Sequence, residues 1–334
     1  MTRLALLLSI TVLIAACGGA GLVEFAYGYE VGDHLVYDVT LEQRLITTVD
    51  LQSAPALLGG ADLPGSADVL VRSDGQVVYD AAAGPDEGTF AITATTTFTE
   101  TTISGEVDGE SIDSLDAVPE GLAPNLDPQT VTIVIDGNGV VLSSTADETN
   151  PLALLDNPIG IGTSVGFDPL NGHLGPEFQT GSLAEGDSWT TVSSVSVLSA
   201  TVETTTAHLL STLEGDLASI DTTYSNDGFT LSLGDLLQLF FGGSADLTDG
   251  TQSGDLPSTV TGSGFDLTIS GSPLEGRGTS VFDTAAGVLM TYEASATIPA
   301  MISVAFPDDT TGEPVEGGIG LVMEVSVTAA LAGE

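Results

Sequence analysis

The sequence predicts an all-β protein, built on a long, curved antiparallel sheet that forms a half-barrel or an open barrel, with a few short helices. Three observations support this fold class. Apolar and polar residues alternate over long segments, which is the period of a strand with one buried face. Threonine and valine, whose branched side chains suit strands, fill these segments. Asp-Gly and Asn-Gly pairs mark turns between them.

The first long strand is predicted from Leu35 to Leu51. Every second residue in its first half is apolar, as at Leu35, Tyr37 and Val39, while the residues between them are mostly polar. An unbroken strand of this length would span roughly 55 Å at about 3.3 Å per residue. That exceeds an ordinary strand, so we expect a bend, a bulge or a hairpin inside it.

Four later segments show the same alternation. They cover residues 89–99, 131–135, 288–298 and 319–331. In the third, the apolar face is predicted to carry Val288, Met290, Tyr292, Ala294, Ala296 and Ile298. Turns are predicted at Asp74-Gly75, Asp108-Gly109, Asp136-Gly137-Asn138-Gly139 and Asn226-Asp227-Gly228.

Two segments predict helices. In residues 232–241, Ser232 can cap the first turn and Gly242 follows the last. This helix is apolar nearly all round, so we expect it to be buried or to line a hydrophobic cavity. The candidate cavity residues are Leu233, Leu236, Leu237, Leu239, Phe240 and Phe241. A second, shorter helix is predicted within residues 150–158, capped by Asn150.

An internal repeat is also predicted. A Gly-Asp pair precedes a strand at Asp33 and again at Asp187, and a similar hairpin follows each pair at Asp136 and at Asp283. The matching order indicates a duplication, although such turns also recur by chance in β proteins. We therefore divide the chain into a first β-rich half (27–150), a connecting segment (151–181) and a second β-rich half (182–333).

The chain begins with the pattern of an export signal. Arg3 precedes an apolar run over residues 4–14, two alanines follow, and then comes Cys17, the sole cysteine in the sequence. The segment Leu13-Ile14-Ala15-Ala16-Cys17 resembles the lipobox of bacterial lipoproteins. This resemblance implies that residues 1–16 are a signal peptide and that Cys17 becomes the acylated N-terminus, followed by a short tether (17–26). It also implies at least two acyl chains, which give stable anchoring.

The charge is strongly acidic. Four arginines and no lysines face 47 acidic residues, for a formal net charge of −43. Such a field repels nucleic acid and anionic lipid headgroups, so we expect no nucleic-acid partner. The remaining arginines after the leader are Arg44, Arg72 and Arg277, and we expect Arg72 and Arg277 to pair with carboxylates on neighbouring strands.

Motifs for catalysis or metal binding are scarce. The three histidines lie far apart in sequence and there is no second cysteine, which leaves a site made of carboxylates alone as the open alternative; no specific metal site and no cofactor are predicted. Residues 162–166 fit the pattern G-x-S-x-G around Ser164, with His173 and His208 downstream. The surrounding prolines and glycines do not fit the strand and helix that a nucleophile elbow requires, which disfavours a hydrolase. For Trp189, packing in the core is favoured over contact with a ligand.

The predicted combination of a lipid anchor, long strands and apolar helices resembles the half-barrel lipoprotein carriers of the LolA/LppX type. It also resembles uncharacterised bacterial lipoproteins with repeated GD-x-W strand starts. The first resemblance implies a non-enzymatic protein that binds a hydrophobic small molecule or lipid between sheet and helices, on the outer face of the bacterial membrane. Alternatives are a structural or protein-interaction module of the envelope and, less favoured, a surface hydrolase.

Overall fold

A computed structural model describes residues 22–50, 65–114, 128–145, 174–197, 200–232, 266–307 and 314–333 of the chain. Within them lie sixteen strands and no α-helix. The strands are β1 (Val23–Glu24), β2 (His34–Asp50), β3 (Ser66–Ala83), β4 (Thr89–Val107), β5 (Glu110–Ile112), β6 (Gln129–Asp136), β7 (Val141–Ser144), β8 (Ser182–Leu183), β9 (Ser188–Val197), β10 (Ala200–Glu214), β11 (Leu217–Asn226), β12 (Phe229–Ser232), β13 (Asp266–Gly271), β14 (Glu275–Asp283), β15 (Val288–Pro307) and β16 (Pro314–Leu331).

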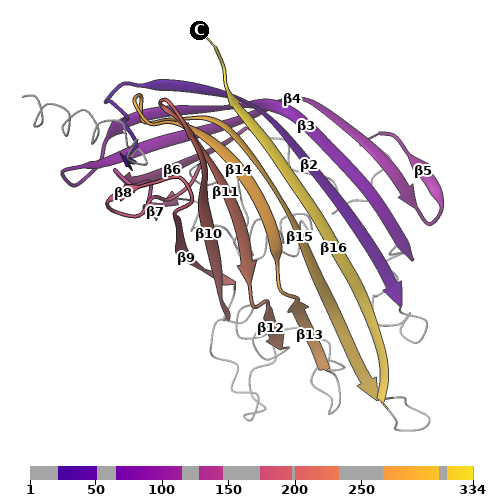
Figure 1. The fold of residues 1–334 in the computed structure, drawn as a ribbon. Coiled ribbons are helices and arrows are strands. Elements are labelled where there is room, and N and C mark those ends of the chain that lie inside the picture. The colour runs from indigo at the N-terminus through magenta and orange to yellow at the C-terminus, as the bar shows by residue number, and fades with distance from the viewer. Residues whose placement is uncertain are drawn as a thin grey trace, which may run out of the picture.

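Fourteen of these strands form one antiparallel sheet. Its main path runs β7-β6-β4-β3-β2-β16-β15-β14-β11-β10-β9, with β5, β12 and β13 paired beside it, while β1 and β8 form a separate pair. The long strands curve together across the molecule (Figure 1). The sheet is unclosed, with β7 and β9 at its two ends, so the predicted all-β, open-sheet fold class is confirmed.

Strand β2 runs its full 17 residues without interruption. Its register to β3 and to β16 has no shift, so the hairpin or bulge predicted inside it is absent. Both neighbours are equally long, at 18 residues each, and they supply backbone partners along almost the whole of β2. The strand accommodates its length by curving with the sheet (Figure 1).

The turn predicted at Asp74-Gly75 is wrong. Both residues lie inside β3, opposite a β-bulge in β4 where Thr99 is the extra residue. A Cβ on Gly75 would lie 2.8 Å from the Phe98 Cα. The glycine is therefore needed because the backbones of β3 and β4 approach closely at the bulge, and it does not mark a turn. The extra residue shifts the alternation of buried side chains in β4 by one. Even-numbered residues such as Ile92 are buried before Thr99, and the odd-numbered Ile103 is buried after it.

A second bulge corrects the predicted face of β15. The register to β14 shifts between Val281 and Phe282, which leaves Met290 unpaired on β15. Leu289 is consequently fully buried, whereas Val288 and Met290, which were predicted on the apolar face, are only partly buried. From Tyr292 to Ile298 every second side chain is buried, as predicted.

The two halves of the chain contain matched corners. Five consecutive members of the path, β2-β3-β4-β6-β7, pair in the same order as β9-β10-β11-β14-β15. Ahead of each set, an aspartate carboxylate accepts the backbone N–H three residues earlier: Glu30 to Asp33 at 2.7 Å and Ala184 to Asp187 at 2.8 Å. The backbone carbonyls of the same two aspartates accept the backbone N–H groups of Ala81 and Leu210, respectively, each at 2.9 Å. Such agreement is what a duplication would leave, and the repeat stays a prediction.

Candidate functional site: the two faces of the sheet

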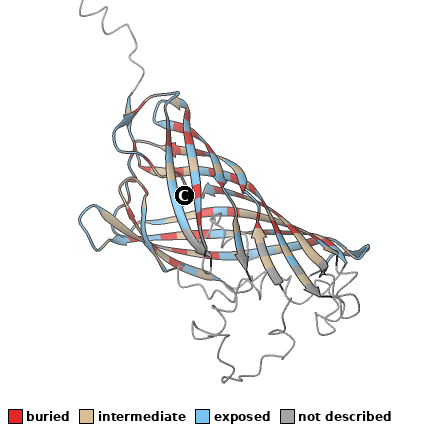
Figure 2. Cartoon of the chain, turned by 90° about the horizontal axis from the view of Figure 1, so that it is seen from below, coloured by how far each residue is buried: buried red, intermediate tan, exposed pale blue. Residues whose placement is uncertain are grey.

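The sheet has one buried face, here called the inner face, and one solvent-exposed outer face. The alternation of buried and exposed residues along the strands is visible in Figure 2. On β2, for example, Tyr37, Val39 and Leu45 face inward and are buried. On β16 the inner face carries Leu321, Met323, Val325, Val327 and Ala329, as the sequence predicts. The inner face is therefore the candidate surface for an apolar ligand.

One end of the inner face is covered by an aromatic plug, which comprises Phe25, Tyr27, Tyr29, Phe178 and Phe282. The ring centroids of Phe25 and Phe178 lie 4.8 Å apart, and those of Tyr27 and Phe282 lie 5.1 Å apart in an edge-on arrangement. The backbone next to these rings is hydrogen-bonded to the hairpins that follow Asp136 and Asp283. The N–H of Tyr27 donates to the carbonyl of Gly137, and the N–H of Gly28 donates to the carbonyl of Gly287. The plug thus locks the two halves together at this end.

Trp189 and His208 extend the plug toward the β9 edge. Trp189 is buried, as predicted, and its indole Nε1 donates to the Glu177 carbonyl at 2.6 Å. The His208 ring stacks on the indole with a centroid separation of 4.9 Å, and its Nδ1 lies 3.1 Å from the Thr222 hydroxyl. Burial lowers the pKa of His208 to about 4, so this imidazole is neutral at physiological pH.

Among the residues that the structure describes, the inner face also holds four buried hydroxyl groups without a hydrogen-bond partner. They belong to Tyr37, Thr47, Thr204 and Ser280. Thr47 lies about 30 Å along β2 from Tyr37, since each residue of a strand advances about 3.3 Å. The residue opposite Thr47 on β16 is the apolar Leu321. An unpaired buried hydroxyl costs about 1–3 kcal/mol, so such groups mark places where a water or a ligand would bind.

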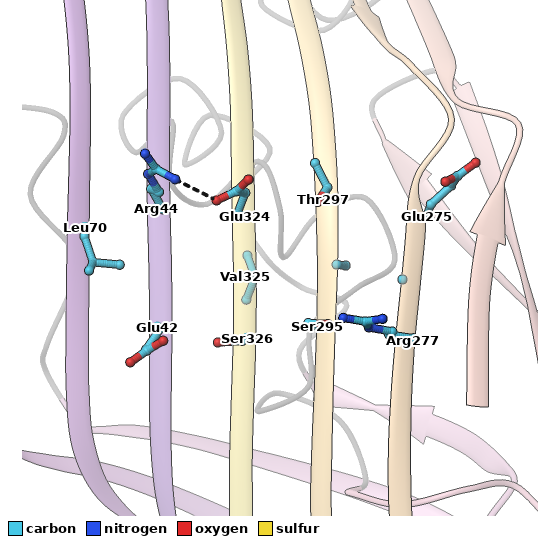
Figure 3. A pocket seen from close by; sticks show the side chains of 12 residues that line it. Glu42, Arg44, Leu70, Glu275, Arg277, Ser295, Thr297, Glu324, Val325 and Ser326 are labelled. Carbon is cyan, nitrogen blue, oxygen red and sulfur yellow. Dashed lines mark hydrogen bonds and ion pairs between the residues drawn. The ribbon is translucent and has the colours of Figure 1, made fainter. Parts of the chain in front are cut away.

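The outer face carries a shallow groove of about 540 Å³ that extends from β3 across β2, β16 and β15 to β14. Ser326 and Glu324 lie on β16 and Ser295 on β15 in the middle of the groove, and further charged side chains lie on β2 and β14 at its two sides (Figure 3). The charged residues that line it are Glu42, Arg44, Glu275, Arg277 and Glu324. None of the described residues that line this groove is aromatic, so they offer hydrogen bonds and charge but no stacking platform.

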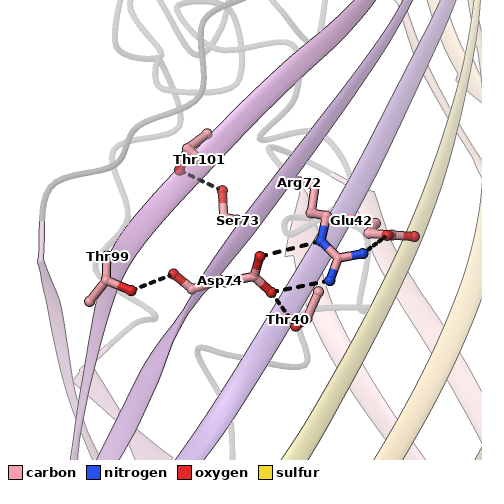
Figure 4. A network of polar contacts seen from close by, with 7 residues as sticks. All are labelled: Thr40, Glu42, Arg72, Ser73, Asp74, Thr99 and Thr101. Atoms are coloured by element: carbon pink, nitrogen blue, oxygen red, sulfur yellow. Dashed lines mark hydrogen bonds and ion pairs between the residues drawn. The ribbon is translucent and has the colours of Figure 1, made fainter.

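All three arginines that follow the leader lie on this outer face. Arg44 forms a bidentate pair with Asp68, with both N···O distances 2.8 Å, and this guanidinium holds the pKa of the Asp68 carboxyl below its usual value. Arg72 lies 3.0 Å from Glu42 and 3.3 Å from Asp74 (Figure 4), which confirms its predicted pairing.

Arg277 departs from the prediction. It forms no ion pair with any residue that the structure describes, although it lies in the groove within a chain of 47 acidic residues. Its neighbours across the sheet are Thr223 on β11 and Ser295 on β15, neither of which is charged. The residues directly opposite this arginine thus offer hydroxyl groups and no carboxylate, and no described residue supplies the predicted ion-pair partner.

Several predicted site residues lie outside the described residues. They are Cys17, Ser164, His173 and the six apolar residues of the predicted helix, Leu233, Leu236, Leu237, Leu239, Phe240 and Phe241. Ser232, predicted to cap that helix, is the last residue of strand β12. The shorter helix predicted within residues 150–158 also lies outside the described part. In the described part no cluster of three metal-ligating side chains occurs, and no helix is long and apolar enough to cross a membrane.

Sequence reasoning missed the four unpaired hydroxyls and the outer groove. The groove had only a weak signal, the scarcity of arginine, since two of the three arginines after the leader, Arg44 and Arg277, line it. The unpaired hydroxyls had no signal in the sequence. A buried threonine hydroxyl forms a hydrogen bond in most proteins, and its partner depends on the neighbouring strands.

Comparisons with known proteins found no matching family and no matching curated protein. Among solved structures, the chain was matched to the Pseudomonas aeruginosa protein OccK7 (OpdD), with 8% sequence identity and a TM-score of 0.19, over 90% of this chain and 100% of the other. It was also matched to a BenF-like porin from Pseudomonas fluorescens Pf-5, with 6% identity and a TM-score of 0.18, over 90% and 99% of the two chains. Similarity at this level supports no inference about function.

Proposed function

We propose that this protein is a non-enzymatic bacterial lipoprotein, anchored through Cys17 on the outer face of the membrane, that holds a hydrophobic or lipid ligand against the inner face of its sheet. The observation that carries the ligand proposal is the set of buried hydroxyls without partners on an otherwise apolar face. An amphipathic ligand supplies both an apolar chain for that face and polar atoms for the hydroxyls.

The location of Thr47 gives this proposal its sharpest test. Its side chain is buried among apolar inner-face residues such as Leu45, whereas its neighbour Thr48 is exposed on the outer face of the same strand. Replacing Thr47 by valine keeps the shape and removes the unpaired hydroxyl. Thr48→Val makes the same chemical change on the solvent side and is the matched control.

We expect the purified protein to release lipid on organic extraction, detected by mass spectrometry, and to bind a fluorescent fatty-acid probe after delipidation. Thr47→Val is expected to weaken probe binding several-fold. It should also raise the unfolding free energy of the delipidated protein by about 1 kcal/mol, since an unpaired polar group is lost. Thr48→Val should change neither quantity. A protein that yields no lipid and binds no probe would disprove the ligand proposal.

A second candidate function is an interaction module of the cell envelope. The observation that favours it is the exposed edge of strand β9, whose residues 192–194 are all exposed. This module would have no ligand, so Thr47→Val would leave probe binding at the background level of the wild type. The lipid extraction therefore separates the two candidates.

A further inference from the structure

The two ends of the sheet are built differently. At one end, β7 is only four residues long, and the segment that follows Pro176 lies beside its hairpin. There the Phe178 N–H donates to the Asn138 carbonyl at 2.8 Å, and the Glu177 carboxylate accepts the N–H of Val141. An edge strand that is short and whose backbone N–H already donates to a carboxylate is protected from pairing with another chain.

At the other end, β9 has none of these protections. It is ten residues long, it pairs in the described part only with β10, and the register of that pair has no shift. Its sequence, SWTTVSSVSV, contains no charge, proline or glycine. Charges, prolines and bulges are the usual means of blocking an edge strand. Toward its outer side, β9 has backbone N–H and C=O groups at every second residue that pair with no described strand.

The exposed side chains of β9 point to a specific kind of partner. Val192, near the centre of the strand, is 62% exposed on the outer face, and Thr190, Ser193 and Ser194 are exposed around it. Elsewhere the chain carries 47 acidic residues, which would oppose the approach of another copy. Two copies can therefore pair along this uncharged strand without placing carboxylates opposite each other.

We propose that two copies of this chain associate by antiparallel pairing of their β9 strands about a two-fold axis. An isologous contact centred on Val192 places this valine beside its counterpart in the second copy and hydroxyl residues beside hydroxyl residues. A two-fold axis perpendicular to the sheet keeps both inner faces on the same side of the joined sheet. The pairing satisfies the free backbone groups and buries the exposed valine.

The charge of the chain predicts an unusual salt dependence for this dimer. The full sequence carries a formal net charge of −43, so repulsion between two copies weakens association at low ionic strength. The screening length falls from about 30 Å at 0.01 M salt to about 3 Å at 1 M. The dimer should therefore become tighter as salt is added, in contrast to dimers held by ion pairs.

The test measures the mass of the purified protein in a non-ionic detergent by light scattering after size exclusion, in 0.05 M and 1 M NaCl. We expect a dimer that is more populated in 1 M NaCl. Val192→Glu places two carboxylates beside each other at the axis and should raise the dissociation constant at least roughly tenfold, about 1.4 kcal/mol. The matched control is Leu142→Glu, the same change at an exposed apolar residue of the β7 edge, and it should leave the dimer intact.

A cross-linking variant guards against a misfolded Val192→Glu protein. Val192→Cys introduces a thiol into a chain whose sole cysteine is Cys17, and mild oxidation should give a covalent dimer. Leu142→Cys should not cross-link. A monomer at both salt concentrations, a dimer that both Val192 variants leave unaffected, or a dimer that only the Leu142 variants disturb would overturn the proposal. None of these results bears on lipid binding, so the two proposals fail independently.

Discussion

At the scale of single residues, His208 links the stability of the fold to pH. Its pKa is about 4 in the folded chain because the ring is buried, against 6.5 for the unperturbed group. The unfolded chain therefore binds a proton between these values that the folded chain does not. The contribution to stability is complete above pH 6.5 and is lost as the pH falls toward 4, up to about 3 kcal/mol.

The variant His208→Gln removes this titration. We expect its unfolding free energy, measured by urea denaturation, to fall less than that of the wild type between pH 7 and pH 4.5. Protonation of the many carboxylates relieves repulsion in both proteins, so the difference between them isolates His208. His34→Gln, which removes an exposed imidazole beside Asp80, corrects for the general effect of losing a histidine. Parallel pH profiles for wild type and His208→Gln would contradict the prediction.

At the scale of strands, the bulge in β4 makes Gly75 indispensable. A Cβ at this position would overlap the Thr97 carbonyl oxygen and lie 2.8 Å from the Phe98 Cα, and both obstacles are backbone. Gly75→Ala should therefore lower the unfolding free energy by about 2–3 kcal/mol, in the range of strained backbone sites.

Gly320 provides the control for that measurement. It also lies inside a long strand, β16, but a Cβ there would meet only the Thr48 carbonyl oxygen at 3.8 Å. Gly320→Ala should leave stability unchanged or raise it slightly, since glycine is unfavourable within a strand. Equal effects of the two substitutions in urea denaturation would show that the close approach at the bulge carries no energetic weight.

The strands that sequence alone could predict are those whose pattern is complete within one segment. The alternation of residues 319–331 and of Val131, Ile133 and Ile135 corresponds to β16 and β6, because one buried face imposes a period of two. The bulges at Thr99 and Met290 could not be predicted, since each is a relation between two strands. The same limit applies to the candidate sites. Whether Arg277 meets a carboxylate, or Thr47 a hydrogen-bond partner, depends on which residues lie opposite on the neighbouring strands, and a single sequence segment does not contain that information.

At the scale of the whole molecule, charge and the proposed anchor belong together. Removal of residues 1–16, which hold one arginine and no acid, leaves three arginines against 47 acidic residues and a net charge of −44. All three arginines lie on the outer face of the sheet, and Arg44 and Arg72 are already paired with carboxylates. The described part of the chain thus offers no basic patch for anionic lipids, so the proposed attachment to a membrane would depend on the acyl chains of Cys17.

Cys17→Ser tests that dependence. The hydroxyl cannot take the thioether-linked lipid, so we expect the variant to appear in the soluble fraction or to remain as an unprocessed precursor with its leader attached. Fractionation of cells, immunoblotting and intact-protein mass spectrometry distinguish these forms from the lipidated wild type. Washing the wild-type membranes with 1 M NaCl should release none of it, because an acyl anchor is insensitive to salt whereas electrostatic binding is screened. Retention of a normally processed Cys17→Ser protein on the membrane would refute the anchor and would require another membrane contact within the chain.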